Sequence, residues 1–306
     1  MDAGDAAMML RDEAAAAALA ALARVIGTEG VSHHAVSVAP LPGLTNASFR
    51  VDTPAGRFAV QLPTHAAPID AMRGHAIAAT RLAHDLGIGA AFVGAEAHSG
   101  AIVTRWVDGA DPATASRLRE RPGAIAALAA LFARLHGSAA RLARRFDPFA
   151  AIAALVAQGA SADGPPASVA VALARAEAEL AARHLANVPI HGDPVPGNVL
   201  AAPDGLVLID WEFAGMGDPA WDIAYFSLEA GLSPEEEDAL AAAHGAPGLD
   251  ARRRQVNRMT AAALAVLWGR ARMRIHAAPD LSGWIAMRHQ ESMRLATRLY
   301  GDGDEG

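Results

Sequence analysis

The segment 191–198, His-Gly-Asp-Pro-Val-Pro-Gly-Asn, places two oxygen-bearing side chains, Asp193 and Asn198, five positions apart on a loop interrupted by prolines and a glycine. A further carboxylate, Asp210, follows the hydrophobic run 206–209. Phosphoryl transfer needs a carboxylate that orients or deprotonates the attacking hydroxyl, and oxygen ligands that hold magnesium against nucleotide phosphates. Asp193 suits the first task, and Asn198 and Asp210 suit the second.

An alternative interpretation is that the prolines and the Asp/Asn pair only form a turn, since turn signals of this kind are common. The order of the motifs along the chain argues against it. A loop of the pattern H-x-D-x-x-x-x-N is followed by a predicted strand, by Ile-Asp-Trp-Glu at 209–212 and by Gly-Met-Gly-Asp-Pro-Ala-Trp-Asp-Ile-Ala at 215–224. This combination is far more specific than a single glycine-rich motif.

Together these segments resemble the motifs of the aminoglycoside phosphotransferase and choline kinase superfamily, and are most similar to its choline/ethanolamine kinase branch. The resemblance also includes 43–51, the helix end at 86–89 and Trp268, so it covers most of the chain. It implies an α+β fold of the protein-kinase-like, two-lobed kind. A small N-terminal lobe with an antiparallel sheet, residues 1–107, would bind the nucleotide. A larger, mainly helical C-terminal lobe, residues 108–306, would carry the catalytic loop and the substrate site.

The resemblance also implies roles for individual residues, with ATP and Mg²⁺ as cofactors. The implied residues are Asp193 as catalytic base, His191 as a support of the catalytic loop, Asn198 and Asp210 as Mg²⁺ ligands, Asp222 as a brace, and Asn46, Ser48, Gln61, Trp106 and Val107 as nucleotide-binding positions. His191 could by itself be a satisfied core histidine, and Asp218 or Asp222 could be only a helix cap.

Small amino alcohols such as choline carry an ammonium group, which proteins bind with aromatic faces and a carboxylate. The resemblance implies such a site around Glu212, Phe213, Tyr225, Glu229 and Trp268. Trp211 and Trp221 could equally be core residues, since tryptophans are usually buried. Phe213 stands where relatives commonly have tyrosine. The segment after Arg274 lacks the aromatic residues that many relatives have there.

The N-terminal lobe departs from a working kinase. Such a lobe has a lysine or arginine on its third strand and a glutamate on the next helix, which together hold the nucleotide phosphates. Here those positions are Gln61 and Ala76. Losing both is coherent, because one buried charge without its partner is unfavourable. Arg73 or Arg50 could supply a replacement cation; without one, turnover would fall by roughly 10²–10³.

Composition limits the classes of partner. The chain has 306 residues, a formal net charge of −7 and no basic run longer than 252–254, which argues against nucleic-acid binding. No cysteine is present, so we expect neither disulfides nor thiolate chemistry. No uncharged stretch reaches the ~18 apolar residues of a membrane span, and the acidic start is unlike a secretory leader. We therefore expect a cytoplasmic protein with a small-molecule partner; its oligomeric state is left open.

Hydrophobic patterning predicts the elements that position these residues. We expect a helix at 12–26, strands at 36–38, 48–51 and 57–62, a helix at 69–86, and strands at 90–93 and 101–107. Beyond the lobe boundary we expect helices at 123–145, 149–158, 167–185, 234–243 and 251–298, interrupted by strands and loops at 189–208. His136 is interpreted as a helix-end histidine.

The leading hypothesis is an ATP-dependent phosphotransferase that phosphorylates the hydroxyl of a small cationic amino alcohol, choline or ethanolamine first. One alternative is a pseudokinase-like binding protein with weak nucleotide use, suggested by Gln61 and Ala76. Another is a kinase for a different substrate, such as thiamine or an aminoglycoside.

Overall fold

The computed structural model describes residues 3–28, 31, 36–43, 45–63, 69–159, 164–275 and 279–301. The chain packs into two compact units. The first consists of Met1–Asp111 with Leu200–Glu212, and the second of Pro112–Val199 with Phe213–Gly306. A sheet dominates the first unit and helices the second, which confirms the predicted α+β class. That 200–212 packs with the first unit was not indicated by the order of elements along the sequence.

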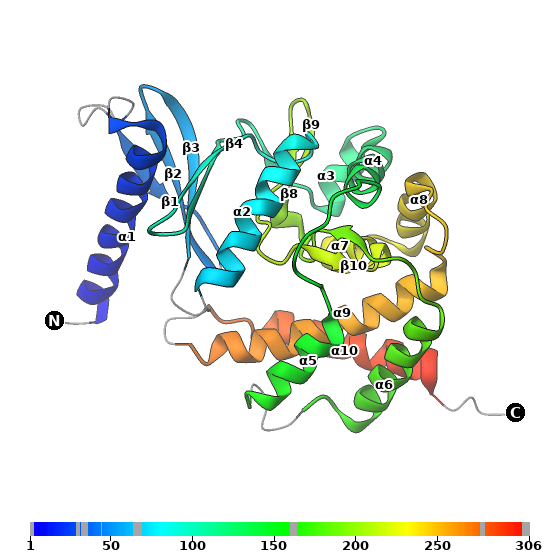
Figure 1. The fold of residues 1–306 in the computed structure, drawn as a ribbon. Helices are drawn as coiled ribbons and strands as arrows, with labels where there is room; N and C mark the ends of the chain where they lie inside the picture. Colours follow the sequence, from blue (N-terminus) through cyan, green and yellow to red (C-terminus); the bar gives the residue numbers. More distant parts are fainter. Residues whose placement is uncertain are drawn as a thin grey trace, which may run out of the picture. The chain divides into compact units, whose positions relative to one another are not determined.

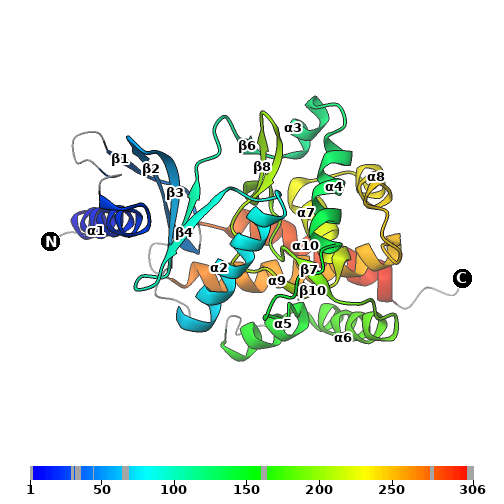
Figure 2. The same cartoon turned by 45° about the horizontal axis from the view of Figure 1, so that its top comes forward.

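Five strands form the antiparallel sheet of the first unit, in the order β1-β2-β3-β5-β4. Figures 1 and 2 show helix α1 on one face of this sheet and helix α2 on the other. The bounds are α1, Ala3–Ile26; β1, Ser37–Pro40; β2, Asn46–Thr53; β3, Gly56–Pro63; α2, Ile69–Asp85; β4, Phe92–Glu96; β5, Ala101–Arg105; β8, Val199–Ala202; and β9, Gly205–Leu208. A short strand β6, Asp111–Pro112, lies where the chain passes from the first unit to the second.

Strand β3 explains how this sheet presents Gln61. Phe58, Val60 and Leu62 are buried in the core cluster that includes Ala18, Ala21 and Leu22 of α1. Side chains alternate between the two faces of a strand, so Gln61 lies on the face away from α1. In the antiparallel register of β2 and β3, Gln61 lies directly opposite Ser48.

Helix α9 is central to the second unit, because α5, α6, α7 and α10 all pack against it. Its apolar core includes Val256, Met259 and Leu267. The bounds are α3, Ala115–Glu120; α4, Ala124–His136; α5, Pro148–Ala157; α6, Ala167–Ala182; β7, Val188–Ile190; a 3-10 turn, Pro196–Asn198; β10, Gly215–Gly217; α7, Pro219–Ala230; α8, Pro234–His244; α9, Ala251–Met273; and α10, Ser282–Tyr300.

Two predicted helices were too long. The single helix expected at 251–298 is divided into α9 and α10, since Pro279 lacks the N–H of a continuous helix and Asp280 accepts a hydrogen bond from the Ser282 amide at 2.9 Å. The helix expected at 123–145 ends at His136, where Gly137 forms the C-terminal cap. Helices α3 and α7 were not among those predicted. Within the described residues, no helix has both the length and the hydropathy to cross a membrane.

The close approach of α9 and α10 depends on Gly269. A Cβ atom there would lie 2.8 Å from Ile285 Cγ1 and 2.9 Å from Trp284 Cζ3. We expect Gly269→Ala to lower the free energy of unfolding by about 1–3 kcal/mol, because the overlap outweighs the better helix propensity of alanine. Urea denaturation measures it. Gly283→Ala is the matched control, since nothing lies within 4 Å of its Cβ; equal stability of the two variants would contradict the packing argument.

Candidate functional site

The backbone that leads into Asp193 is held by the carboxylate of Asp222. The amide of His191 donates to Asp222 Oδ2 at 2.8 Å, and the amide of Gly192 donates to Oδ1 at 2.9 Å. Asp222 is fully buried on α7, at 0% exposure. Burial alone would raise the pKa of Asp222, but its hydrogen bond to His136 and the neighbouring histidines lower it below its usual value. A charged carboxylate therefore fixes two consecutive peptide groups.

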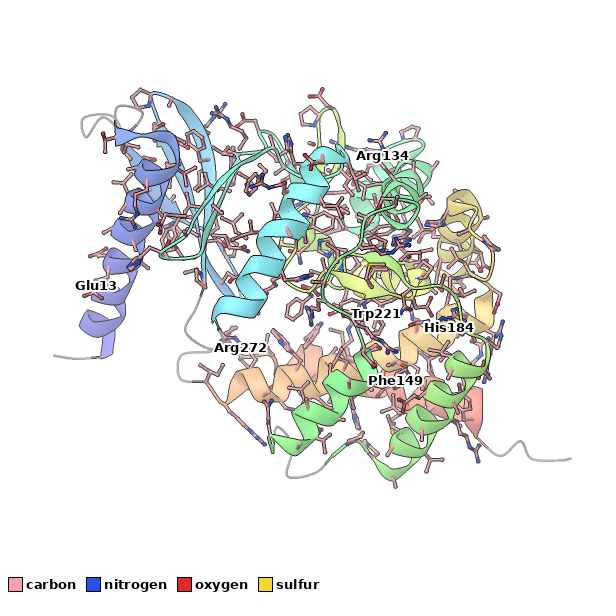
Figure 3. All side chains as sticks on the ribbon, viewed as in Figure 1. Glu13, Arg134, Phe149, His184, Trp221 and Arg272 are labelled. Carbon is pink, nitrogen blue, oxygen red and sulfur yellow. The ribbon has the colours of Figure 1, made fainter. Side chains whose placement is uncertain are left out.

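Gly192 and Trp221 complete this anchor. Gly192 has a φ of +82°, and a Cβ atom there would lie 2.4 Å from the carbonyl oxygen of Phe213. Trp221 Nε1 donates to the Gly192 carbonyl at 2.9 Å. Trp221 is 1% exposed and lies inside the second unit (Figure 3). It is thus a core residue that also holds the loop.

Asp193 lies on this anchored loop among polar partners. Asn198 Nδ2 donates to the Asp193 carbonyl at 2.9 Å and to its carboxylate oxygen Oδ2 at 3.1 Å. Tyr225 lies close enough to Asp193 for the charge of that carboxylate to raise the pKa of the tyrosine hydroxyl. Because the amide nitrogen of Asn198 is engaged by Asp193, its Oδ1 is the atom that can serve a cation. That arrangement fits the predicted pairing of a base with a magnesium ligand.

His191 lies beneath the loop. Its side chain is 0% exposed, and its Nδ1 accepts a hydrogen bond from the Asp193 amide at 3.3 Å. This placement suits support of the loop and not direct contact with a substrate.

A histidine pair behind Asp222 was not foreseen. His136 Nε2 lies 3.0 Å from Asp222 Oδ2, and its Nδ1 lies 2.9 Å from His244 Nε2. Burial, followed by the nearby His136, lowers the pKa of His244 to about 4. Since the three residues come from α4, α7 and α8, no local spacing in the sequence could have revealed the chain that they form.

In the first unit, two amide side chains hold the carboxylates of the returning segment. Gln61 Nε2 donates to Asp210 Oδ1 at 2.9 Å, and Asn46 Nδ2 donates to Glu212 Oε2 at 2.8 Å. Asp210 has a φ of +62°, which makes it the one non-glycine residue with positive φ in the described part of the chain. Aspartate tolerates this left-handed conformation better than most residues. Gln61 thus holds the Asp210 carboxylate by a hydrogen bond. Its position in place of the lysine of other kinases did not suggest this contact.

The other predicted nucleotide-binding positions lie in the same unit. Ser48 faces Gln61 across the strand pair, and the amide of Trp106, which precedes Val107, donates to the Arg57 carbonyl at 3.0 Å. Arg50 is engaged by both Asp52 oxygens, at 2.8 and 2.7 Å, and lies 5.1 Å from the Trp106 ring centre.

The positions predicted to replace the phosphate-binding ion pair, and one of the two proposed replacement cations, have the following surroundings among the described residues. Ala76 is 2% exposed and Gln61 is bound to Asp210, while Arg50 is paired with Asp52. The side chain of Arg73, the other proposed cation, lies outside the described residues.

The predicted substrate residues are divided among different surroundings. Glu229 of α7 faces Arg288, whose Nε lies 2.8 Å from Oε1 and whose Nη2 lies 3.1 Å from Oε2; Trp284 Nε1 also donates to Oε2 at 3.1 Å. Trp268 meets Trp284 edge to face, with ring centres 6.2 Å apart. Arg288 and Trp284 were missed, because the predicted helix 251–298 gave no hint of a second helix that folds back.

Two predicted substrate residues do not join Glu229 in these contacts. Phe213 lies 5.7 Å from the guanidinium of Arg144, and Glu212 is held by Asn46 in the first unit. Tyr225 lies one helical turn before Glu229, and the charges of both Asp193 and Glu229 act on its hydroxyl. Burial raises the pKa of Tyr225 well above its ordinary value; the charges of Asp193 and Glu229 raise it further.

Residues 37–279 match the model of a family described as the phosphotransferase enzyme family. The chain belongs to this family. Protein LicA of Haemophilus influenzae is 50% identical over 52 residues, which are 17% of this chain and 20% of LicA. The matched part thus spans only a fifth of that curated relative's length.

Solved structures resemble the phosphotransferase over nearly its whole length. A choline/ethanolamine kinase family protein from Mesorhizobium loti has a TM-score of 0.76 and 26% identity, covering 93% of this chain and 94% of that one. Choline kinase LicA from Streptococcus pneumoniae has a TM-score of 0.77 and 22% identity, covering 90% and 99%. LicA in complex with AMP has a TM-score of 0.76 and 22% identity, covering 89% and 96%. These likenesses confirm the protein-kinase-like fold.

Within this phosphotransferase, metal binding is tested by donor chemistry. Asn198 and Asp210 offer the oxygen atoms that Mg²⁺ prefers, and Mg²⁺ ordinarily takes only one or two protein carboxylates, with phosphate and water completing its shell. Over the described ranges, no group of three or more His, Asp or Glu side chains gathers as a metal site. Each of the two side chains, taken by itself, therefore offers an oxygen donor of the kind that fits Mg²⁺.

The histidine pair predicts a dependence of stability on pH. His244 titrates at about 4 in the folded chain, below its ordinary 6.5, so the unfolded chain binds its proton first. Folding stability is then unaffected above pH 6.5 and falls as the pH drops from 6.5 toward 4, by roughly 2 kcal/mol from this group.

We expect His244→Gln to flatten that part of the profile, measured by urea denaturation at a series of pH values. His184→Gln is the control, since His184 is exposed (Figure 3). A profile that keeps its slope in His244→Gln would contradict the assignment.

Proposed function

We propose that this phosphotransferase transfers the γ-phosphoryl group of ATP to the hydroxyl of a small amino alcohol, with choline and ethanolamine as the first candidates. The carboxylate of Asp193, held beside Asn198 and Tyr225 on an anchored loop, is the observation that carries the proposal. The names of the solved relatives support the substrate class, and the AMP complex of LicA supports an adenine nucleotide.

In this mechanism, Asp193 accepts the proton of the attacking hydroxyl. The acceptor oxygen forms a bond to the γ-phosphorus while the bond between that phosphorus and the ADP oxygen breaks. The hydrogen bond from Asn198 orients the Asp193 carboxylate, and the anchor at Asp222 keeps the loop in place before the substrate arrives.

Magnesium bound with the nucleotide would neutralise the charge that develops on the phosphates. Asn198 and Asp210 would hold it, and Gln61 orients Asp210 for that task. Asn46, Ser48, Trp106 and Val107 remain the proposed nucleotide-binding positions. The acidic, cysteine-free composition supports the cytoplasm as the proposed compartment and a small molecule, not nucleic acid, as the partner.

A second candidate is a binding protein that uses nucleotide weakly. It is favoured by the replacement of the lysine–glutamate pair by Gln61 and the buried Ala76. Thermal-shift titration separates the two: strong stabilisation by ATP with Mg²⁺ supports the kinase, whereas stabilisation by choline alone supports the binder. Assays with thiamine and aminoglycosides test other kinase substrates.

We expect Asp193→Asn to lower kcat by roughly 10²–10⁴, because the hydroxyl loses its proton acceptor. ADP release with choline and ethanolamine measures the effect. Asp204→Asn, at an exposed position, is the control and keeps wild-type activity. Full activity in Asp193→Asn, or no phosphorylation of any amino alcohol by the wild type, would overturn the proposal.

We expect Gln61→Leu to raise the KM for MgATP about ten-fold, since loss of a hydrogen bond worth ~1.4 kcal/mol leaves Asp210 poorly oriented. The KM for the amino alcohol should change little. Initial rates at varied MgATP measure it, with Gln158→Leu at an exposed helix end as the control. An unchanged KM would show that the Gln61–Asp210 contact does not serve the nucleotide.

A further inference from the structure

One face of α7 leads from the catalytic loop to Glu229. Trp221, Tyr225 and Glu229 are spaced four apart, so they lie on the same side of the helix in successive turns. Trp221 Nε1 donates to the Gly192 carbonyl of the loop, and Tyr225 lies near the charge of Asp193. Glu229 is the next residue on this face, about 6 Å further along the axis than Tyr225. A small acceptor with its hydroxyl at Asp193 would direct its other end toward Glu229.

The charge of Glu229 is already balanced by a cation of this chain. The Glu229 side chain is 9% exposed and that of Arg288 13%, and their closest atoms, Oε1 and Nε, lie 2.8 Å apart. Those two atoms are in ionic contact, but they are too poorly aligned to count as hydrogen-bonded and are buried without another partner. The pair is therefore neutral as a whole and incompletely satisfied.

Helix α10 determines the place of Arg288. Trp284, one turn earlier, donates to Glu229 and packs at Gly269 and Trp268 of α9. Arg288 also lowers the pKa of Tyr225, the residue between Trp221 and Glu229 on this face. The charge of Arg288 therefore acts on Tyr225 as well as on Glu229.

A simple ammonium alcohol could use Glu229 only by displacing Arg288. That exchange would leave a largely buried guanidinium without a counter-ion, which is strongly unfavourable. An acceptor with both an ammonium and a carboxylate avoids this loss, because its ammonium takes Glu229 and its carboxylate takes the released guanidinium. Arginine suits the second contact, since its planar fork matches a carboxylate.

We propose that Arg288 determines specificity at this site and selects zwitterionic acceptors, which carry a hydroxyl, an ammonium and a carboxylate, over purely cationic amino alcohols. This rests on the proposed kinase function and narrows its substrate class. Among the described residues, no acceptor is bonded to Nη1 of Arg288, so the fork keeps donors for a ligand.

L-Serine and ethanolamine test the proposal, because they differ only by the carboxylate. In the wild type we expect kcat/KM to be at least ten-fold higher for L-serine. Arg288→Gln should shift the ratio at least 100-fold toward ethanolamine, mainly through KM. Arg288→Lys keeps the charge but loses the planar fork, so it should keep only part of the preference for L-serine. Arg294→Gln, in a surface pair with Glu291, is the control. The same ratio in wild type and Arg288→Gln would overturn the inference.

Calorimetric binding of both ligands without nucleotide separates this inference from the kinase proposal. If no variant phosphorylates either ligand but Arg288→Gln reverses their relative affinities, the specificity assignment stands and the kinase proposal falls. If the relative affinities do not change, the specificity assignment falls whatever the activity. Should Arg288→Gln fail to fold, Arg288→Lys serves in its place: without the planar fork, the affinity for L-serine should fall relative to that for ethanolamine, and an unchanged ratio would overturn the assignment.

Discussion

The candidate site depends on one interaction: the Asp222 carboxylate accepts hydrogen bonds from the amides of His191 and Gly192. A buried carboxylate that accepts two amide hydrogens stabilises a turn that its own residues would not maintain. Asp193 follows at once, so its position is inherited from Asp222. Trp221 holds the same turn from the carbonyl side, which leaves little freedom in the backbone before the proposed base.

A second constraint is the neutral character of Gln61 and Ala76, which stand at the positions predicted for a charged pair. Where a kinase lobe has a lysine–glutamate pair, this chain has an amide that binds Asp210 and a buried alanine. A neutral hydrogen bond needs no counter-ion and loses less hydration than a buried charge. The loss of both charges is therefore compatible with a stable sheet, although it removes a fixed cation from the side that would meet phosphates.

At Glu229, by contrast, the predicted charge is present, but it is already paired with Arg288. The resemblance of the sequence to choline kinases predicts Glu229 as a partner for an ammonium, yet Arg288 and Trp284 contact its carboxylate. Net charge at such a site is decided by the sum of its residues and not by the acid alone. Family membership therefore identifies the chemistry of this phosphotransferase more firmly than its acceptor.

The sequence by itself determined the fold class and singled out the loop 191–198 with Asp193 and Asn198, because these depend on local spacing and on motifs in a fixed order. Only the tertiary structure decided the contacts between distant segments. Gln61 with Asp210, His136 with Asp222 and His244, and Glu229 with Arg288 each join positions far apart in the chain. Periodicity reports which face of a helix or strand is buried, but not which distant side chain lies against it.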